Sequence, residues 1–396
     1  MGGHKIFFNA YLDPRAGGPS GYLANLATGL SLVGADDRIR IVPQGPKLAP
    51  APEGAHPTDE VLRGHLESYL NPQHIKLAPF QLAPLLEGET KSIHAHFTVD
   101  ALKVINSLEE IGRRDVSVIL TSHCPESVAL EASNGWRRKG YNSSLCDQYE
   151  FALREIEAIA FKKSDVWIFP SERAMDPYYD TIPGFADLAA DKDIRFVVTG
   201  APPVTLSHNE PPEKKRLGLE GKKVVAFMGR HEPIKGYDIF VDAMLPLVEA
   251  RPDLAVVVAG RLDGVVPPSH PRWLEIGWTS SPEVLFSISD VFVLPNRRTY
   301  FDLVLIEAMA AGKAVIASAT GGNISVFEMT SGALALFDGS VQSLMNTVAN
   351  LIDNQDIVSD LGLRAKQAYE DYFTLEKFAK GYKETIGEIW RDYAII

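Results

Sequence analysis

The chain has 396 residues, of which 45% are hydrophobic and 23% are charged, the profile of a globular protein. A chain of this length fits two domains of about 200 residues better than a single core. Its formal net charge of −12 argues against a nucleic-acid partner and against more than peripheral contact with an anionic membrane, because both attract basic surfaces.

The start of the chain and its cysteines predict a soluble cytoplasmic protein. The opening stretch MGGHKIFFNAYLD lacks the features of a secretory signal, and no apolar run in the sequence reaches the length of a membrane span. The two cysteines, Cys124 and Cys146, fit a reduced compartment, and we find no spacing typical of metal ligands. We therefore expect neither a metal nor another cofactor.

Short runs rich in Val, Ile and aromatic residues alternate with helical patterns along the whole chain. Alternation of this kind predicts βαβ units and parallel sheets. In the first half we expect strands at residues 5–11, 92–97, 116–123, 165–171 and 195–200. In the second half we expect them at residues 222–228, 254–260, 291–295 and 313–318.

A change of composition separates the two halves. The stretch APPVTLSHNEPPEKKRLGLEG is rich in Pro and charge, as linkers are. We predict an α/β protein with two doubly wound Rossmann-like domains that face a cleft. The domains comprise residues 1–202 and 222–375, with a linker at 203–221 and a C-terminal helix at 376–396 that crosses back onto the first domain.

Ligands of such sheets bind outside the carboxyl ends of the strands, so the residues that follow each strand are candidate ligand contacts. Gly17 and Gly18 follow the first strand and permit close approach to an anion, although a plain turn is equally consistent with them, and Ser20 is a candidate helix cap. Arg230 and Lys235 follow the strand at 222–228 and suggest a phosphate or diphosphate ligand. The alternative is an ion pair with Glu232 or Asp238.

Histidines also follow two strands of the first half. His123 lies after the strand at 116–123 and is a candidate hydrogen-bond partner of a substrate hydroxyl, or a structural histidine at a domain edge. His94 and His96 lie on one side of a strand, and we favour a structural role for them because further metal ligands are missing.

The segment LVLIEAMAA is predicted to be a buried helix with one carboxylate, Glu307. Asp302 is placed as its N-cap and Gly312 as the residue that ends it. A buried charge needs a partner, which is either a group inside the protein or a ligand.

The combination of GRHEPIKGYD, SDVFVLPNRRTYFDLVLIEAMAAGKAVIAS and TGGN resembles the donor half of a family 4 retaining glycosyltransferase of the GT-B fold. The resemblance is good over about 222–323 and looser in the first half. It implies that Glu307 accepts hydrogen bonds from a nucleotide ribose and that Arg230 and Lys235 hold the diphosphate. It further implies that the loop of Gly17 and Gly18 covers the diphosphate and that His123 lies near the transferred sugar. We also assign Trp278, Phe301 and Leu303 to the donor site.

One position departs from the family pattern. The family carries two glutamates separated by seven residues, and Thr299 stands where the first, a contact of sugar hydroxyls, is expected. The glycine usually found three residues later is Asp302. Asp302 is therefore either a second carboxylate for the sugar or the helix cap, and we slightly favour the cap.

The resemblance implies an enzyme that moves a sugar from a UDP- or GDP-type nucleotide sugar to a glycan, lipid-linked or small-molecule acceptor, with retention of anomeric configuration. We expect a role in glycan, polysaccharide or glycoconjugate biosynthesis. The alternatives are a nucleotide-sugar 2-epimerase, an inactive nucleotide-sugar-binding homologue and a two-domain sugar-binding protein. The stretch from Glu126 to Tyr149 resembles an inserted loop. Its basic aromatic tip is a candidate acceptor contact or a solvated surface, and it comprises Trp136, Arg137, Arg138 and Lys139.

Overall fold

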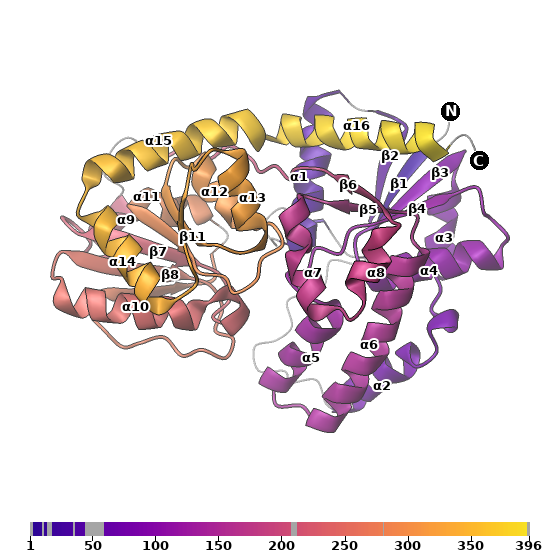
Figure 1. Cartoon of the computed structure of the whole chain (residues 1–396), viewed down its shortest axis with the longest axis horizontal. Coiled ribbons are helices and arrows are strands. Elements are labelled where there is room, and N and C mark those ends of the chain that lie inside the picture. The colour runs from indigo at the N-terminus through magenta and orange to yellow at the C-terminus, as the bar shows by residue number, and fades with distance from the viewer. Residues whose placement is uncertain are drawn as a thin grey trace. The chain divides into compact units, whose positions relative to one another are not determined.

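The computed structural model describes residues 3–9, 12–13, 18–34, 36–43, 59–206, 212–279 and 281–393. The chain divides into two compact units (Figure 1). Unit 1 comprises Met1–Val198 together with Leu375–Ile396, and unit 2 comprises Thr199–Thr374. Within the described ranges, every helix is too short or too polar to span a lipid bilayer.

Unit 1 contains a six-stranded parallel sheet with the strand order β2-β1-β3-β4-β5-β6. Its strands are β1 (Gly3–Phe8), β2 (Ile39–Pro43), β3 (Thr90–Ala95), β4 (Ser117–Leu120), β5 (Val166–Phe169) and β6 (Asp193–Phe196). Its α-helices are α1 (Gly18–Leu32), α2 (Asp59–Tyr69), α3 (Pro79–Leu86), α4 (Thr98–Glu110), α5 (Val128–Arg138), α6 (Ser143–Lys163), α7 (Asp176–Thr181), α8 (Phe185–Ala190) and α16 (Leu375–Tyr393). Two short 3₁₀ turns, η1 (Pro72–His74) and η2 (Glu172–Met175), complete the unit.

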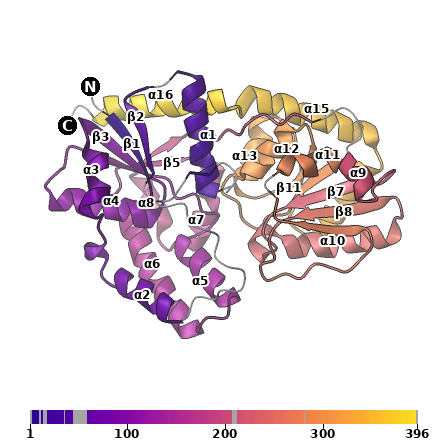
Figure 2. The ribbon, with the colours of Figure 1, turned by 180° about the vertical axis from the view of Figure 1, so that it is seen from behind.

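Helices cover both faces of this sheet. Successive residues of a strand point to opposite faces, so neighbouring residues enter different cores. Ile6 of β1 belongs to a core with Leu23 of α1 and Phe378 of α16, whereas its neighbour Phe7 packs into a second core with Val104 of α4. Helices α1 and α16 lie against each other although they come from opposite ends of the chain (Figure 2).

Unit 2 contains a second six-stranded parallel sheet, with the order β12-β11-β10-β7-β8-β9. Its strands are β7 (Lys223–Met228), β8 (Leu254–Ala259), β9 (Trp273–Gly277), β10 (Val291–Leu294), β11 (Ala314–Ser318) and β12 (Ala335–Phe337). Its helices are α9 (Pro212–Arg216), the 3₁₀ turn η3 (Pro233–Lys235), α10 (Tyr237–Ala250), α11 (Pro282–Ile288), α12 (Leu303–Ala310), α13 (Gly321–Met329), α14 (Val341–Ile352) and α15 (Gln355–Tyr372). The main core lies between the sheet and α10, α14 and α15, and contains Val256, Phe240 and Leu344.

The predicted fold class is confirmed: both halves are α/β, with parallel strands alternating with helices. Two strands are shifted toward the N-terminus, since the strand expected at 5–11 is β1 at Gly3–Phe8 and the strand expected at 195–200 is β6 at Asp193–Phe196. Beyond β6 the chain stays extended, and the Val197 amide donates to the Phe169 carbonyl at 2.8 Å.

Candidate active site

The candidate residues of unit 2 gather where the strand order of its sheet reverses. From the β7–β10 pair, the chain continues to β8 and β9 on one side and to β11 and β12 on the other. The carboxyl ends of the two strands at such a reversal flank the ligand crevice of doubly wound sheets. Arg230 and Lys235 follow β7, and Asp302 and Glu307 follow β10. The topology therefore brings the predicted cations and carboxylates to one edge of one sheet.

The segment after β7 packs closely against the residue that follows β10. Gly236 has φ of +67°, and a Cβ built on it would lie 1.7 Å from the Pro295 carbonyl oxygen. Only glycine fits this position without moving backbone, so this close approach depends on Gly236. The approach places Lys235 beside the start of α12.

Lys235 and Arg230 both have acidic partners. The Lys235 ammonium lies 2.8 Å from the Asp302 carboxylate, and Arg230 Nε lies 2.8 Å from Glu232 Oε1. The predicted alternative of an ion pair with Glu232 is thus present for Arg230, and the Arg230 side chain nevertheless remains 43% exposed. Asp238, the other acid considered, pairs instead with Arg297 at 2.6 Å.

Asp302 occupies the N-cap position of α12, but its side chain makes no capping hydrogen bond. The prediction of a side-chain cap is therefore wrong. Both carboxylate oxygens are engaged elsewhere, since Oδ1 accepts from Lys235 and Oδ2 accepts from Asn296 Nδ2 at 2.6 Å. A charged partner outweighs a cap here because charge-assisted hydrogen bonds are the stronger kind. Sequence reasoning missed Asn296, although it lies only two residues beyond β10.

Helix α12 ends as predicted. Gly312 has φ of +67°, its amide donates to Met309, and the Lys313 amide donates to Ala308, which is the Schellman pattern. The helix is not covered equally all round. Leu303 and Glu307, one turn apart, are partly exposed, whereas the residues between Glu307 and Gly312 on the core side are buried.

The Glu307 carboxylate has neither a hydrogen bond nor an ion pair with any part of the chain that the structure describes. Burial, and after it the negative charge of Glu283, raises the pKa of Glu307 to about 7. A partly buried carboxylate without a partner carries a desolvation penalty that a hydrogen-bonding ligand would relieve. The partly exposed side of α12 that carries Leu303 and Glu307 is thus suited to a ligand with hydroxyl groups.

Thr299, which replaces the expected glutamate, is fully buried. Its Oγ1 has no hydrogen-bond partner among the described residues. The reason for its burial is the start of α13, where Gly321 has φ of +44° and a Cβ would lie 2.1 Å from the Thr299 carbonyl oxygen. Phe301, two residues on, is also buried and contacts the ring of Phe373.

Trp278 follows β9 at the same edge of the sheet and is 53% exposed. The Arg261 guanidinium lies over its ring, 5.6 Å from the centroid. Sequence reasoning missed Glu275 of β9, whose carboxylate joins two elements. Its Oε1 accepts hydrogen bonds from the Tyr237 hydroxyl at 2.6 Å and from Trp273 Nε1 at 2.7 Å. These hydrogen bonds connect β9 to the start of α10, directly after Gly236.

In unit 1, His123 follows β4 and has φ of +63°, an uncommon value for a residue other than glycine. Its Nε2 lies 2.7 Å from Nδ1 of His96, and its ring packs edge-on to Tyr22. Burial lowers the pKa of His123 to about 3, so its imidazole is neutral at neutral pH. Gly18, with φ of +51°, begins α1.

Two predictions on the first glycine loop have different outcomes. Gly17 lies outside the described residues. Ser20 does not cap α1 but lies in its first turn, where its Oγ accepts from the Asp13 amide at 2.7 Å.

His94 and His96 are buried in a polar network at the centre of unit 1. His94 Nδ1 lies 2.8 Å from the Tyr382 hydroxyl, and His94 Nε2 lies 2.9 Å from Thr121 Oγ1. The same hydroxyl lies 2.8 Å from Nε2 of His4. The network therefore links β1 and β3 to α16.

The stretch around residues 126–149 is not a loop, and that expectation is wrong. It forms α5 and the start of α6, joined by a short turn. Arg137 is tied to α6 by ion pairs with Asp147 at 2.6 Å and Glu150 at 3.1 Å. Trp136 packs against Tyr141 and Tyr149, and Lys139 lies over its ring at 5.5 Å. Arg138 is the last residue of α5.

The fold is shared with solved glycosyltransferases. Sucrose-phosphate synthase from Thermosynechococcus elongatus matches with a TM-score of 0.65 at 17% identity, over 98% of this chain and 100% of that one. Anabaena HepE, solved in complex with UDP-glucose, matches with a TM-score of 0.64 at 16% identity, over 97% and 99% of the two chains. These likenesses define the class: the protein has the GT-B fold.

Sequence comparisons find similarity to a known family over part of the chain. Residues 222–354 match the family model Glycosyl transferases group 1. The match runs from β7 to α14 and is a similarity to that family over this segment of unit 2.

Among curated relatives, D-inositol 3-phosphate glycosyltransferase of Segniliparus rotundus is 30% identical over 200 residues, which are 46% of this chain and 44% of that protein. The lipopolysaccharide core biosynthesis mannosyltransferase LpsB of Rhizobium meliloti is 36% identical over 122 residues, or 27% and 35% of the two chains. The chain thus spans less than half the length of these two relatives.

Proposed function

We propose that this protein transfers a sugar from a nucleoside-diphosphate sugar to an acceptor, with retention of anomeric configuration, in the biosynthesis of a glycan, polysaccharide or glycoconjugate. The observation that carries the proposal is Glu307: a partly buried carboxylate, with no hydrogen bond or ion pair to any described residue, lies at the same edge of the unit 2 sheet as Arg230 and Lys235. A nucleoside diphosphate carries both complementary groups, ribose hydroxyls for the carboxylate and a diphosphate for the cations.

The roles of the residues follow from their charges. Glu307 accepts hydrogen bonds from the ribose, which favours its ionised form and removes the desolvation penalty. Arg230 and Lys235 stabilise the negative charge that grows on the departing diphosphate, and preorganised groups of this kind lower the barrier most. No divalent metal is needed in this account, because the two side chains supply the positive charge.

His123 fits the role of a neutral partner for a sugar hydroxyl. Its lowered pKa keeps it uncharged, and the bond to His96 fixes its ring. A neutral imidazole offers one donor and one acceptor, which suits a hydroxyl better than a diphosphate. By analogy, the donor is a UDP- or GDP-type nucleotide sugar and the acceptor is glycan-like. HepE was solved with UDP-glucose, and LpsB is a lipopolysaccharide core mannosyltransferase.

One observation favours a second candidate, an inactive nucleotide-sugar-binding protein. Thr299 is buried where the family glutamate reaches the sugar, and the nearby Asp302 carboxylate is held by Lys235. Such a protein would bind the nucleotide sugar without cleaving it.

The test is a panel of UDP and GDP sugars, with thermal shift and release of nucleoside diphosphate as the two readouts, each with and without EDTA. A ligand selective for the folded state raises the melting temperature, so UDP or GDP should do so. We expect diphosphate release that survives EDTA. If no common nucleoside diphosphate or nucleotide sugar shifts the transition at millimolar concentration, the proposal is wrong. Binding without release would identify the inactive homologue, and an epimerised sugar formed without an acceptor would identify a 2-epimerase.

A further inference from the structure

The buried histidines of unit 1 form two hydrogen-bonded groups, and in the first group the ends determine where each proton lies. The Thr121 hydroxyl donates its single proton to the Ile168 carbonyl at 2.8 Å, so it accepts from Nε2 of His94 at 2.9 Å. Burial lowers the pKa of His94 well below its usual value, so its ring is neutral and Nδ1 accepts from the Tyr382 hydroxyl at 2.8 Å. Tyr382 has no second proton, and it therefore accepts from Nε2 of His4 at 2.8 Å.

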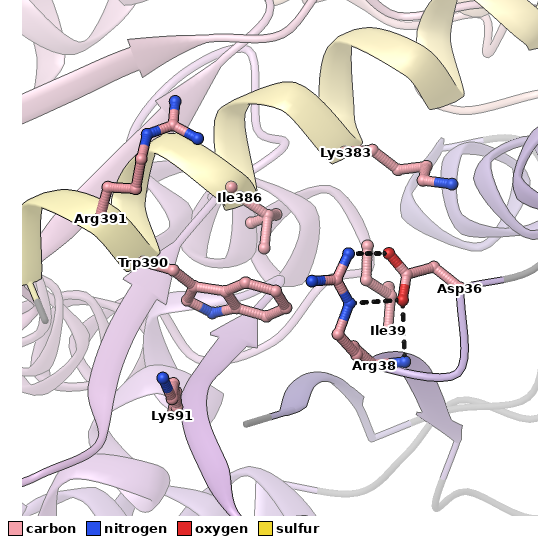
Figure 3. A pocket seen from close by; sticks show the side chains of 9 residues that line it. Asp36, Arg38, Ile39, Lys91, Lys383, Ile386, Trp390 and Arg391 are labelled. Carbon is pink, nitrogen blue, oxygen red and sulfur yellow. Dashed lines mark hydrogen bonds and ion pairs between the residues drawn. The ribbon is translucent and has the colours of Figure 1, made fainter. Parts of the chain in front are cut away.

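The same chain of donors and acceptors continues to α16. Neutral His4 accepts at Nδ1 from the Ser92 hydroxyl at 2.8 Å, and Ser92 accepts from Nε1 of Trp390 at 3.0 Å. Trp390 is the side chain of α16 that lines a pocket at the amino ends of β2 and β3 (Figure 3). Both nitrogens of His4 and both of His94 are thus used within this group. His94 therefore gives His96 no hydrogen bond, although the centres of their rings lie 4.2 Å apart.

His96 and His123 form the second group, which is a pair. Nδ1 of His96 lies 2.7 Å from Nε2 of His123, and the two ring planes differ by 19°. The other nitrogen of His96, Nε2, is buried and has no hydrogen-bond partner in the part of the chain that the structure describes. Burial lowers the pKa of both residues, so both rings are neutral. One proton therefore lies between the rings, and it belongs either to His96 or to His123.

The unpartnered nitrogen of His96 distinguishes these two arrangements. If His123 donated, the single proton of neutral His96 would lie on Nε2 and form a buried N–H group without a partner. Such groups are rare in folded proteins, because they lose their hydrogen bond to water and gain none. If His96 donates from Nδ1, its Nε2 carries only a lone pair, and the proton of neutral His123 lies on Nδ1. The burial of His96 thus favours the arrangement in which His96 donates.

We propose that His96 is a positioning residue for the sugar end of the donor site: it donates to Nε2 of His123, so that His123 offers the transferred sugar a hydrogen-bond donor at Nδ1 and no acceptor. The sugar contact in this proposal rests on the proposed function. The backbone and a neighbouring ring also hold His123 in one place. Its φ of +63° is a conformation that side chains adopt only where the surroundings impose it, and the ring of Tyr22 packs edge-on at 4.6 Å between centres. A donor fixed in this way recognises an oxygen of the sugar.

The first measurement needs no ligand and is therefore independent of the proposed function. In the full chain with isotope-labelled histidine, NMR shifts of the ring nitrogens distinguish protonated from unprotonated nitrogen. The signals of His123 are assigned by their loss in His123→Asn. At pH 7 we expect Nδ1 of His123 to be protonated and Nε2 to be unprotonated. A protonated Nε2 with an unprotonated Nδ1, or exchange between the two forms, would overturn the proposal.

The second measurement compares two ligands by calorimetry, the UDP or GDP sugar that gives the largest thermal shift and its free nucleoside diphosphate. His96→Leu removes the donor that fixes His123. It should weaken the nucleotide sugar by about three- to tenfold, the loss expected for one neutral hydrogen bond, and leave the free diphosphate unchanged. His96→Asn, whose side-chain amide can donate from a position near Nδ1, should retain most of the affinity for the nucleotide sugar. The control is His94→Gln, which replaces the ring beside His96 without removing the bond to His123, and it should leave both affinities unchanged.

The outcomes separate a positioning role from a structural one. Equal losses for both ligands in His96→Leu, or the same selective loss in His94→Gln, would show that His96 only supports packing and would overturn the proposal. Binding of neither ligand by the natural protein would overturn the proposed function and the sugar contact with it. The NMR measurement on the natural protein would still decide whether His96 sets the tautomer of His123.

Discussion

The ammonium group of Lys235 and the carboxylate of Asp302 form an ion pair at 2.8 Å between the segments that follow β7 and β10. Asn296 holds the second carboxylate oxygen at 2.6 Å, so the pair is fixed from two sides. A diphosphate that is to be bound by Lys235 must compete with this carboxylate. The pair therefore sets how much of the positive charge of Lys235 a donor can use.

The first prediction concerns this competition. Asp302→Asn removes the negative charge while keeping the size of the side chain, so Lys235 becomes available to a diphosphate. We expect the affinity for the free nucleoside diphosphate to rise by about three- to tenfold, on the order of 1 kcal/mol. Isothermal titration of both proteins measures this. Asp238→Asn, which breaks the exposed pair with Arg297 in the same unit, is the control and should change little. A lower affinity in Asp302→Asn would mean that the carboxylate positions Lys235 for the ligand.

The second prediction concerns binding through Glu307. Glu307→Gln should weaken nucleoside diphosphate and intact nucleotide sugar alike, by on the order of 1.5–3 kcal/mol or roughly tenfold to a hundredfold. The reason is the loss of a charged acceptor for the ribose. Glu283→Gln on the neighbouring helix is the control and should retain binding. Thr299→Ala should leave diphosphate binding intact, and equal losses for both ligands in that variant would show that the ribose and sugar ends are misplaced.

The third prediction concerns the stability of the same variant without ligand. The pKa of Glu307 is raised to about 7 in the folded protein, so the folded state binds this proton more tightly than the unfolded state. The stabilisation that follows from this raised pKa is complete at pH values below the pKa of Glu307 in the unfolded chain. It is lost as the pH rises through about 7, the pKa in the folded protein. Glu307→Gln should therefore be more stable than the natural protein above pH 7, by on the order of 1 kcal/mol. Urea unfolding at several pH values should show this difference shrinking toward pH 4.5, and a difference that does not depend on pH would contradict the account.

The fourth prediction concerns the histidine network. Burial lowers the pKa of His4 and of His123 to about 3, and it lowers the pKa of His94 and His96 well below the usual value. The unfolded chain takes up these protons first as the pH falls, so stability is full above about pH 6.5 and declines toward pH 3. His4→Gln keeps polar contacts to Ser92 and Tyr382 but cannot be protonated, so its stability should decline less steeply than that of the natural protein. Exposed His74→Gln should decline like the natural protein, and identical slopes in all three would contradict the prediction.

The fifth prediction tests the turn between α5 and α6 as an acceptor contact. Arg137 is left unchanged because its ion pairs hold the two helices together. Arg138→Ala with Lys139→Ala should reduce transfer to an anionic acceptor severalfold while hydrolysis of the donor and affinity for the nucleotide stay the same. The control is Lys162→Ala near the far end of α6. Unchanged transfer kinetics in the double variant would return this turn to the solvated surface.

The sequence by itself determined the elements whose signal is local. The inner strands β7, β8, β10 and β11 are buried on both faces, so they read as continuous Val, Ile and Ala runs that are recognised without a structure. The termination of α12 at Gly312 was predictable for the same reason, since a Schellman end involves only neighbouring residues. Strands β2, β9 and β12 escaped prediction because they lie at sheet edges, where partial exposure breaks the apolar run.

Only the tertiary structure decided what the charged and polar side chains do. Asp302 has the sequence signature of a helix cap, but a lysine 67 positions earlier in the chain takes its carboxylate. Tyr382 lies 288 positions from His94, yet the two share a hydrogen bond. Patterns along a chain reflect local backbone geometry and the burial of one face, whereas the partner of a charge depends on which distant segments the sheet order brings together. For this protein, sequence therefore predicted which residues stand at the strand ends. The fold decided which of them pair with each other and which, like Glu307, have no side-chain partner among the described residues.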